Sequence, residues 1–287
     1  MERLMTDQVT NNRLQEPARI FAWILLFAAF AAVYYPVLSG LVRAWNASDD
    51  NSHGFLIIPL SAYILWRNRS ELSAQPVDGS WIGFPMALFS LLLFLFGKFG
   101  SILTLLPFSM IIFIWSTVIF FFGFKFFRLC SFPLFFLLFM VPVPEQIYAA
   151  LTNPLQFIVT KVTVALASMM GVIIYREGNV IHLSDMTFQV VQACSGLRSI
   201  MTMLTLGAIL GYFALRTPLT RIILVAAGVP IAIAVNIFRV FTMVIAYNYF
   251  KINLSEGTPH TILGLVVFAL GFVFFIVLQK GLATCEK

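Results

Sequence analysis

Long apolar stretches recur along this chain of 287 residues and constrain its fold more than any other feature. An α-helix needs about 20 predominantly apolar residues to cross the hydrocarbon core of a bilayer, where each backbone polar group must be paired within the segment. The sequence therefore predicts an all-α polytopic membrane protein with about eight transmembrane helices and with both termini on one side. The stretches that reach or approach this length are residues 20–41, 54–66, 81–97, 102–123, 127–141, 195–215, 219–247 and 260–279.

The composition agrees with this class of protein. Hydrophobic residues make up 60% of the chain and charged residues only 10%, whereas a soluble domain carries about 25% charged residues. The net charge is +6, but the basic residues stand singly at the ends of apolar stretches and form no continuous patch. This placement is typical of residues that orient a protein in the membrane. We therefore expect the protein to interact with the lipid bilayer and not with nucleic acid.

The same basic residues predict the orientation of the chain. If the N-terminus is cytoplasmic, eleven of the 18 Lys and Arg residues lie on the cytoplasmic side, in the sense of the positive-inside rule. We therefore expect a single inner-membrane domain over residues 1–287, with cytoplasmic tails at 1–19 and 280–287. The stretches 54–66 and 127–141 are short, and the sidedness downstream is reversed if either one does not cross the membrane.

Residues 142–194 are expected to form an extracytoplasmic segment. From 148 to 171 the polar residues fall largely on one face of a helix, which predicts an amphipathic helix that lies at the membrane interface or walls a cleft. Short β-like runs around Ser184 and Asp185 then predict a small β-hairpin that leads directly into Cys194.

Helical rise places three chemically capable residues at one depth in the membrane. Cys194, Arg239 and His260 each lie 18 to 22 residues from a basic residue that is expected on the cytoplasmic side. At about 1.5 Å per residue, these separations are roughly 27–33 Å, the thickness of the hydrocarbon core. All three residues are therefore expected near the extracytoplasmic face.

Arg239 lies within an apolar stretch, where an arginine costs roughly 2.5–3.5 kcal/mol on the insertion scale. Such a cost indicates that Arg239 has a specific function. Asn236 precedes Arg239 by three residues and shares its helix face, so the pair is expected to point into a polar cavity. The alternative is an arginine whose side chain extends to the nearby lipid headgroups.

Cys194 is expected at a helix N-terminus, with Arg198 one turn further on. Both the helix dipole and a nearby arginine favour a thiolate, although a lone membrane cysteine is ordinarily a small apolar residue. Geometry alone leaves His260 and His53 as competing partners, because each stands at the start of an apolar stretch. A cysteine, a histidine and an arginine at one level can perform acyl transfer through a thiolate, an acid/base and an oxyanion partner.

Three short motifs carry a resemblance to a known family. They are ACSGLRS at residues 193–199, NIFRV at 236–240 and TPHTILG at 258–264, in this order along the chain. Together with the SHG at 52–54 and the PVP at 142–144, they make the chain similar to the exosortases of bacteria and their archaeosortase relatives.

The resemblance implies a multi-pass cysteine protease or transpeptidase. It implies that Cys194 is the nucleophile, His260 the acid/base, and Arg239 the partner of the oxyanion or of a substrate carboxylate. Arg198, Asn236 and His53 are expected to support substrate binding. Substrates of the family are exported, membrane-tethered proteins with a C-terminal sorting signal, which is a Pro-Glu-Pro-like motif, a transmembrane helix and a basic tail. An amine acceptor is an implied further partner, and such systems are often linked to exopolysaccharide export.

Other classes of function fit the sequence less well. A transporter or exopolysaccharide-export component predicts charged residues throughout the bilayer depth, whereas here they gather at one face. A metalloprotease is disfavoured because the chain contains no H-E-x-x-H, and its three cysteines show no metal-site spacing. We therefore expect neither a metal nor a cofactor. A purely structural membrane protein would explain the composition but not three polar residues at one depth.

Overall fold

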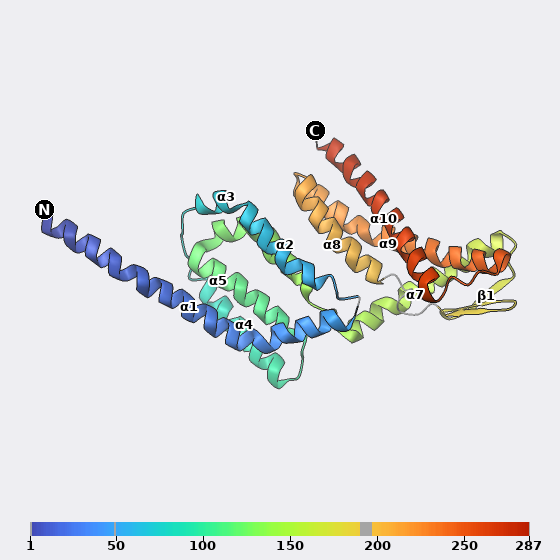
Figure 1. Ribbon diagram of the computed structural model, residues 1–287, viewed down its shortest axis with the longest axis horizontal. Helices are drawn as coiled ribbons and strands as arrows, with labels where there is room; N and C mark the ends of the chain where they lie inside the picture. Colours follow the sequence, from blue (N-terminus) through green and yellow to red (C-terminus); the bar gives the residue numbers. More distant parts are fainter. Residues whose placement is uncertain (1, 49, 190–196, 287) are drawn as a thin grey trace. The chain divides into compact units, whose positions relative to one another are not determined.

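The computed structural model describes residues 2–48, 50–189 and 197–286. The chain divides into two compact units, Met1–Pro142 and Val143–Lys287, and each is described by itself. Figure 1 shows that both units are built mainly of helices and that a small sheet belongs to the second.

The first unit packs around aromatic side chains. The ring of Tyr34 is 1% exposed and lies 5.0–5.9 Å from the rings of Phe30, Phe94 and Phe113. Helix α4 packs along α5, and Gly83 allows this close approach because a Cβ there would collide with the backbone of α5. The elements of this unit are α1 (Glu2–Ala47), α2 (Gly54–Arg67), α3 (Arg69–Ser73), α4 (Gly83–Phe99), α5 (Leu105–Leu129), α6 (Ser131–Phe136) and the 3₁₀ helix η1 (Leu137–Met140).

Helix α5 is interrupted at Gly123, whose backbone is left-handed in φ (φ 85°, ψ 175°). A side chain at this position would collide with the carbonyl oxygen of Asp78. The predicted continuous helix over residues 127–141 is wrong. Instead, Cys130 adopts a turn conformation (φ −85°, ψ 3°) between α5 and α6, and η1 follows α6 directly. Val141 after η1 is extended (φ −80°, ψ 120°), as is typical of a residue that precedes a proline.

The second unit is organised around its longest helix, α9, which packs on α7, α8 and α10. One buried cluster joins α7, the sheet and α9 and includes Val159, Ile181 and Val244. A second cluster joins α8, α9 and α10 and includes Met203 and Phe275. The elements are α7 (Glu145–Met169), β1 (Ile174–Glu177), β2 (Val180–Leu183), β3 (Thr187–Gln189), α8 (Leu197–Ala214), α9 (Pro218–Phe250) and α10 (Gly257–Cys285).

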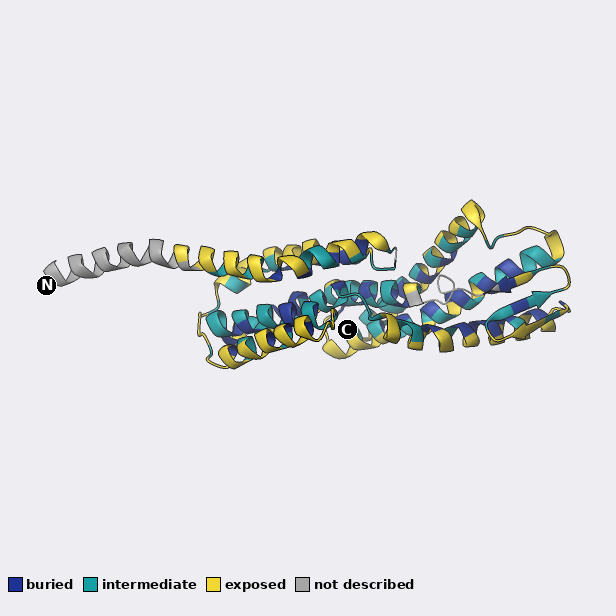
Figure 2. Cartoon of the chain, turned by 90° about the horizontal axis from the view of Figure 1, so that it is seen from below, coloured by how far each residue is buried: buried dark blue, intermediate teal, exposed yellow. Residues whose placement is uncertain are grey.

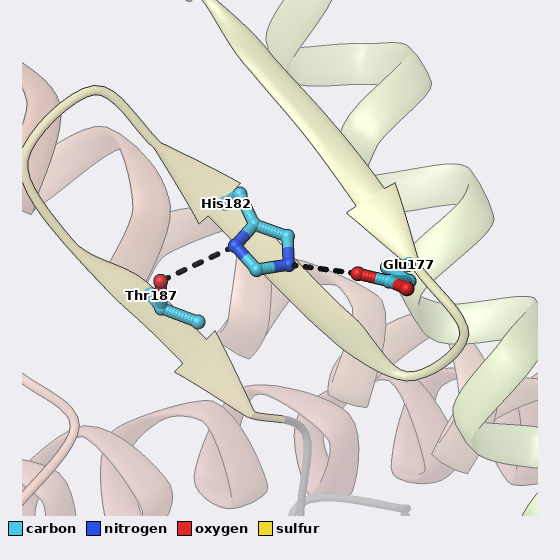
Figure 3. A network of polar contacts seen from close by, with 3 residues as sticks. All are labelled: Glu177, His182 and Thr187. Atoms are coloured by element: carbon cyan, nitrogen blue, oxygen red, sulfur yellow. Dashed lines mark hydrogen bonds and ion pairs between the residues drawn. The ribbon is translucent and has the colours of Figure 1, made fainter.

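The predicted hairpin is present within a three-stranded antiparallel sheet of order β1-β2-β3. The predicted turn at Ser184 and Asp185 joins β2 to β3, while β1 is an additional strand that turns at Gly178 (φ 61°). Figure 3 shows His182 between its neighbours on the sheet, with Nδ1 3.3 Å from the Thr187 hydroxyl and Nε2 3.9 Å from a Glu177 carboxylate oxygen.

Five helices of the described chain are long and apolar enough to cross a membrane, which makes this a multi-pass membrane protein. They comprise 25 residues of α1 (Trp23–Ala47) and the whole of α5, α7, α9 and α10. Helices α2, α4 and α8 and the stretch Ser131–Met140 are apolar but shorter, so the count of eight spans stays a prediction.

Helix α7 covers the stretch that was expected to be amphipathic. Its polar residues Thr152, Gln156, Thr160 and Thr163 are buried, whereas apolar residues such as Phe157 are exposed. Figure 2 shows this alternation of buried and exposed residues along the helices of the chain. A buried polar face agrees with the predicted amphipathic pattern, although Lys161 and Ser168 are exposed. Because α7 is also long enough to cross, its interfacial position stays a prediction.

Candidate functional site

Arg239 and His260 meet between α9 and α10. The guanidinium Nη2 of Arg239 lies 2.7 Å from Nε2 of the His260 imidazole, although the two residues are 21 positions apart. The close approach follows from the way α9 ends. Lys251 takes a left-handed conformation (φ 57°, ψ 25°), and its N–H bonds back to the carbonyl of Tyr247. Residues 251–256 then reverse the chain, so that α10 begins beside the C-terminal half of α9.

The His260 ring is held from both sides. Its Nδ1 lies 3.2 Å from the carbonyl oxygen of Leu254 in the loop before α10. A carbonyl only accepts hydrogen bonds and a guanidinium only donates them, so Nδ1 carries the proton and the Nε2 lone pair accepts from Arg239. The contacts therefore select one neutral tautomer of the imidazole.

The Arg239 guanidinium has no carboxylate partner among the described residues. The ion pair of Lys251 with Asp185 and the contact of His182 with Glu177 both lie elsewhere in the unit. The Nε of Arg239 is buried and makes no hydrogen bond in the described structure, and a second contact of Nη2, to the His260 carbonyl, is long at 3.5 Å. The segment 190–196, which contains Cys194, has no acidic residue in its sequence either. A partly buried cation with an unused donor is suited to bind an anionic oxygen.

The other predicted site residues of the second unit are placed as follows. Cys194 lies outside the described residues, and the described part of α8 begins three positions later, at Leu197. Arg198 is exposed in the first turn of α8. Asn236 is buried in α9, at 3% exposure, one turn before Arg239. The structure thus brings Arg239 and His260 into contact, with Asn236 on the adjacent turn.

His53 belongs to the first unit and has a structural partner there. Its Nε2 lies 3.1 Å from the carbonyl oxygen of Phe139 in η1. Next to it, the Trp45 indole N–H donates to the carbonyl of Met140 at 2.9 Å. These two contacts hold the end of α1 and the start of α2 against η1.

Sequence reasoning did not find the Leu254 carbonyl, because a backbone acceptor leaves no signal in residue type. Only the loop geometry reveals it.

No group of three or more His, Cys, Asp or Glu side chains lies close enough to hold a metal ion within residues 2–48, 50–189 and 197–286.

These features define a multi-pass helical membrane protein with an arginine and histidine pair between two long apolar helices. The family model of the transmembrane exosortases (Exosortase_EpsH) matches residues 45–277, a range that includes Cys194, Arg239 and His260. The chain therefore belongs to the exosortase family, which is a family of membrane sorting enzymes, as the sequence motifs indicated. No curated protein and no solved structure matches the chain.

Proposed function

We propose that this protein is a membrane-embedded cysteine endopeptidase or transpeptidase. Its substrates are exported, membrane-tethered proteins with a C-terminal signal of the Pro-Glu-Pro (PEP-CTERM) type. The observation that carries the proposal is the direct contact of Arg239 with His260, in a chain whose family match also includes Cys194. The family match also favours an enzyme over the transporter alternative.

The proposed reaction begins when His260 Nε2 takes the thiol proton of Cys194 and the thiolate attacks the scissile carbonyl carbon. The carbonyl electrons form an oxyanion, for which the Arg239 guanidinium is the donor. When the tetrahedral species collapses, the C–N bond breaks and His260 gives its proton to the leaving amine. A thioester to Cys194 remains, and attack by water or by an acceptor amine releases the product as an acid or as an amide.

The resting contact between Arg239 and His260 adds one requirement to this sequence. The single Nε2 lone pair cannot accept a proton from Cys194 while it accepts a hydrogen bond from Nη2. The guanidinium must therefore turn from Nε2 towards the substrate, whether to a carboxylate of the signal or to the reacting carbonyl. Its unused Nε–H is an available donor for this second position. Substrate binding would then release Nε2 of His260 from Arg239. Without substrate, the contact with Arg239 would keep His260 from accepting the thiol proton.

The deciding experiment measures processing of a membrane-tethered reporter that carries a Pro-Glu-Pro-type signal. Wild type is compared with Cys194→Ala and with Cys285→Ala, an exposed cysteine that serves as the matched control. We expect loss of the cleaved product with Cys194→Ala only. Equal cleavage by Cys194→Ala and wild type would exclude Cys194 as the nucleophile.

Mass analysis of the new C-terminus separates the two outcomes of the second step. A free carboxylate shows hydrolysis, whereas a mass increase that corresponds to an amide shows transfer to an amine. Absence of cleavage by the wild type, with signals of several related motifs, would contradict the proposed substrate class.

A further inference from the structure

Gly264 lies in α10 one helical turn after His260 and directly under the Arg239 guanidinium. A Cβ at position 264 would lie 3.0 Å from Nη2, 3.2 Å from Cζ and 3.6 Å from Nη1 of Arg239. A side chain at this position would therefore press against the guanidinium group more closely than most Cβ atoms approach their neighbours. Glycine is suited to such a site because it lets another group approach the backbone closely.

The atom closest to this missing Cβ is also the atom that bonds to His260. Nη2 of Arg239 lies 2.7 Å from Nε2 of His260, and residues four apart on a helix lie on the same face. A methyl group at position 264 would push the guanidinium by a few tenths of an ångström, and a larger side chain would displace it further. Both the contact with His260 and the direction of the unused Nε–H would change.

We propose that Gly264 is a positioning residue, whose lack of a side chain sets where the Arg239 guanidinium lies relative to His260. Its effect on activity rests on the proposed function, but its effect on the geometry of the pair does not. Gly264 touches no reacting atom in this proposal and acts only through Arg239.

The same helix offers two matched controls. Gly271 also faces α9, and a Cβ there would lie 2.8 Å from a Val235 methyl and 3.1 Å from the Met203 methyl, so Gly271→Ala crowds the packing of α10 without touching Arg239. Gly281 has no atom within 4 Å of an added Cβ, so Gly281→Ala tests only the exchange of glycine for alanine in α10.

The first test needs no substrate. Protein labelled with ¹⁵N at its three histidines is studied by NMR in lipid nanodiscs, and the His260 signals are assigned by their loss in His260→Gln. For the wild type we expect a neutral ring protonated at Nδ1, with Nε2 in a hydrogen bond. Gly264→Ala should shift the Nε2 resonance, whereas Gly271→Ala and Gly281→Ala should leave it in place. An unchanged Nε2 resonance in folded Gly264→Ala, or an equal shift in Gly271→Ala, would overturn the proposal.

The second test measures processing of the reporter. We expect Gly264→Ala to lower kcat by about tenfold or more, because small misplacements of a catalytic group reduce rates strongly. Gly271→Ala and Gly281→Ala should stay within about twofold of wild type. A wild-type kcat for Gly264→Ala would contradict the catalytic consequence.

The two tests separate the proposals. If the wild type processes no reporter, the proposed function fails, and the NMR comparison still decides whether Gly264 positions Arg239. Gly264→Val, with a larger side chain, should shift the Nε2 resonance more than Gly264→Ala. Equal shifts in the two variants would count against a steric effect.

Discussion

At the scale of single residues, the two ring nitrogens of His260 have different partners. Leu254 accepts from Nδ1 and Arg239 donates to Nε2, so the ring is held in one tautomer before any substrate binds. His53, the competing histidine, contacts the backbone of η1 instead. The geometry supports His260 as the proposed acid/base and a structural role for His53.

These contacts predict different outcomes for the two histidines. His260→Ala should abolish processing of the reporter at normal protein abundance, because His260 is the proposed acceptor of the thiol proton. His53→Ala should retain processing and lose about 1 kcal/mol of stability, the net value of one hydrogen bond. The measurements are reporter cleavage and thermal unfolding in detergent. Normal cleavage by His260→Ala together with loss in His53→Ala would reverse the assignment of the base.

At the scale of elements, the start of α9 is capped from the far end of α10. The Glu286 carboxylate accepts from the backbone N–H groups of Arg216 at 2.8 Å and Thr217 at 2.9 Å, and also from the Thr220 hydroxyl. An anion at a helix N-terminus is favourable, because the first N–H groups there have no partner within the helix. Hydrogen bonds, led by the one from Thr220, lower the Glu286 pKa to about 2.

This cap predicts a pH-dependent stability. Since the folded-state pKa of Glu286 lies below its ordinary value of 4.5, the contribution is complete above about pH 4.5 and is lost as the pH falls towards 2. Glu286→Gln should therefore unfold at a lower temperature than wild type at pH 7, and this difference should shrink between pH 4.5 and 2. Thermal unfolding in detergent measures both, with exposed Glu71→Gln as the control. A difference that does not depend on pH would contradict an ionised cap.

The break in α5 predicts a second effect at this scale. Gly123→Ala should destabilise the first unit for two reasons. A φ of 85° is unfavourable for alanine, and the alanine methyl group would collide with the Asp78 carbonyl. We expect a loss on the order of 1–3 kcal/mol, typical of backbone strain. Gly40→Ala in α1, where an added Cβ meets no atom within 4 Å, is the control. Equal stability of the two variants would show that the turn at Gly123 adapts without cost.

The sequence predicts the elements that depend on local pattern. The long apolar helices α5, α9 and α10 and the turn at Ser184 and Asp185 follow from hydropathy and turn chemistry. The split of residues 127–141 does not, because apolar content stays high through the turn at Cys130. Helical rise brought Arg239 and His260 to one depth, but their contact depends on the loop after Lys251. Gly264 ends the TPHTILG motif, but the sequence does not indicate a function for it. Its proposed positioning role follows only from the short distance between an added Cβ and the Arg239 guanidinium.

At the scale of the whole molecule, membership of the exosortase family and five long apolar helices establish a multi-pass membrane protein. The inner membrane, the sidedness of the chain and the position of the site at the extracytoplasmic face stay predictions from the distribution of basic residues. The turn at Gly178 is a suitable position at which to test the sidedness, because it belongs to the sheet and lies far from both chain ends in sequence.

Reporter fusions test this orientation. We expect a reporter that is active only in the cytoplasm to be active at either chain end and inactive when it is inserted after Gly178. A reporter that is active only outside the cytoplasm should give the reverse pattern. Opposite activities at the two chain ends would show an odd number of crossings and contradict the predicted layout.

The ion pair between Lys251 and Asp185, at 2.6 Å, joins the turn of the sheet to the loop between α9 and α10. Cys194 follows Asp185 by nine residues, and His260 follows Lys251 by nine. The proposed nucleophile and base therefore each lie nine residues in sequence from one ion pair, although 66 residues separate the two members of that pair. Short tethers raise the effective concentration of one group around the other, since the entropy of loop closure grows with the length of chain between them.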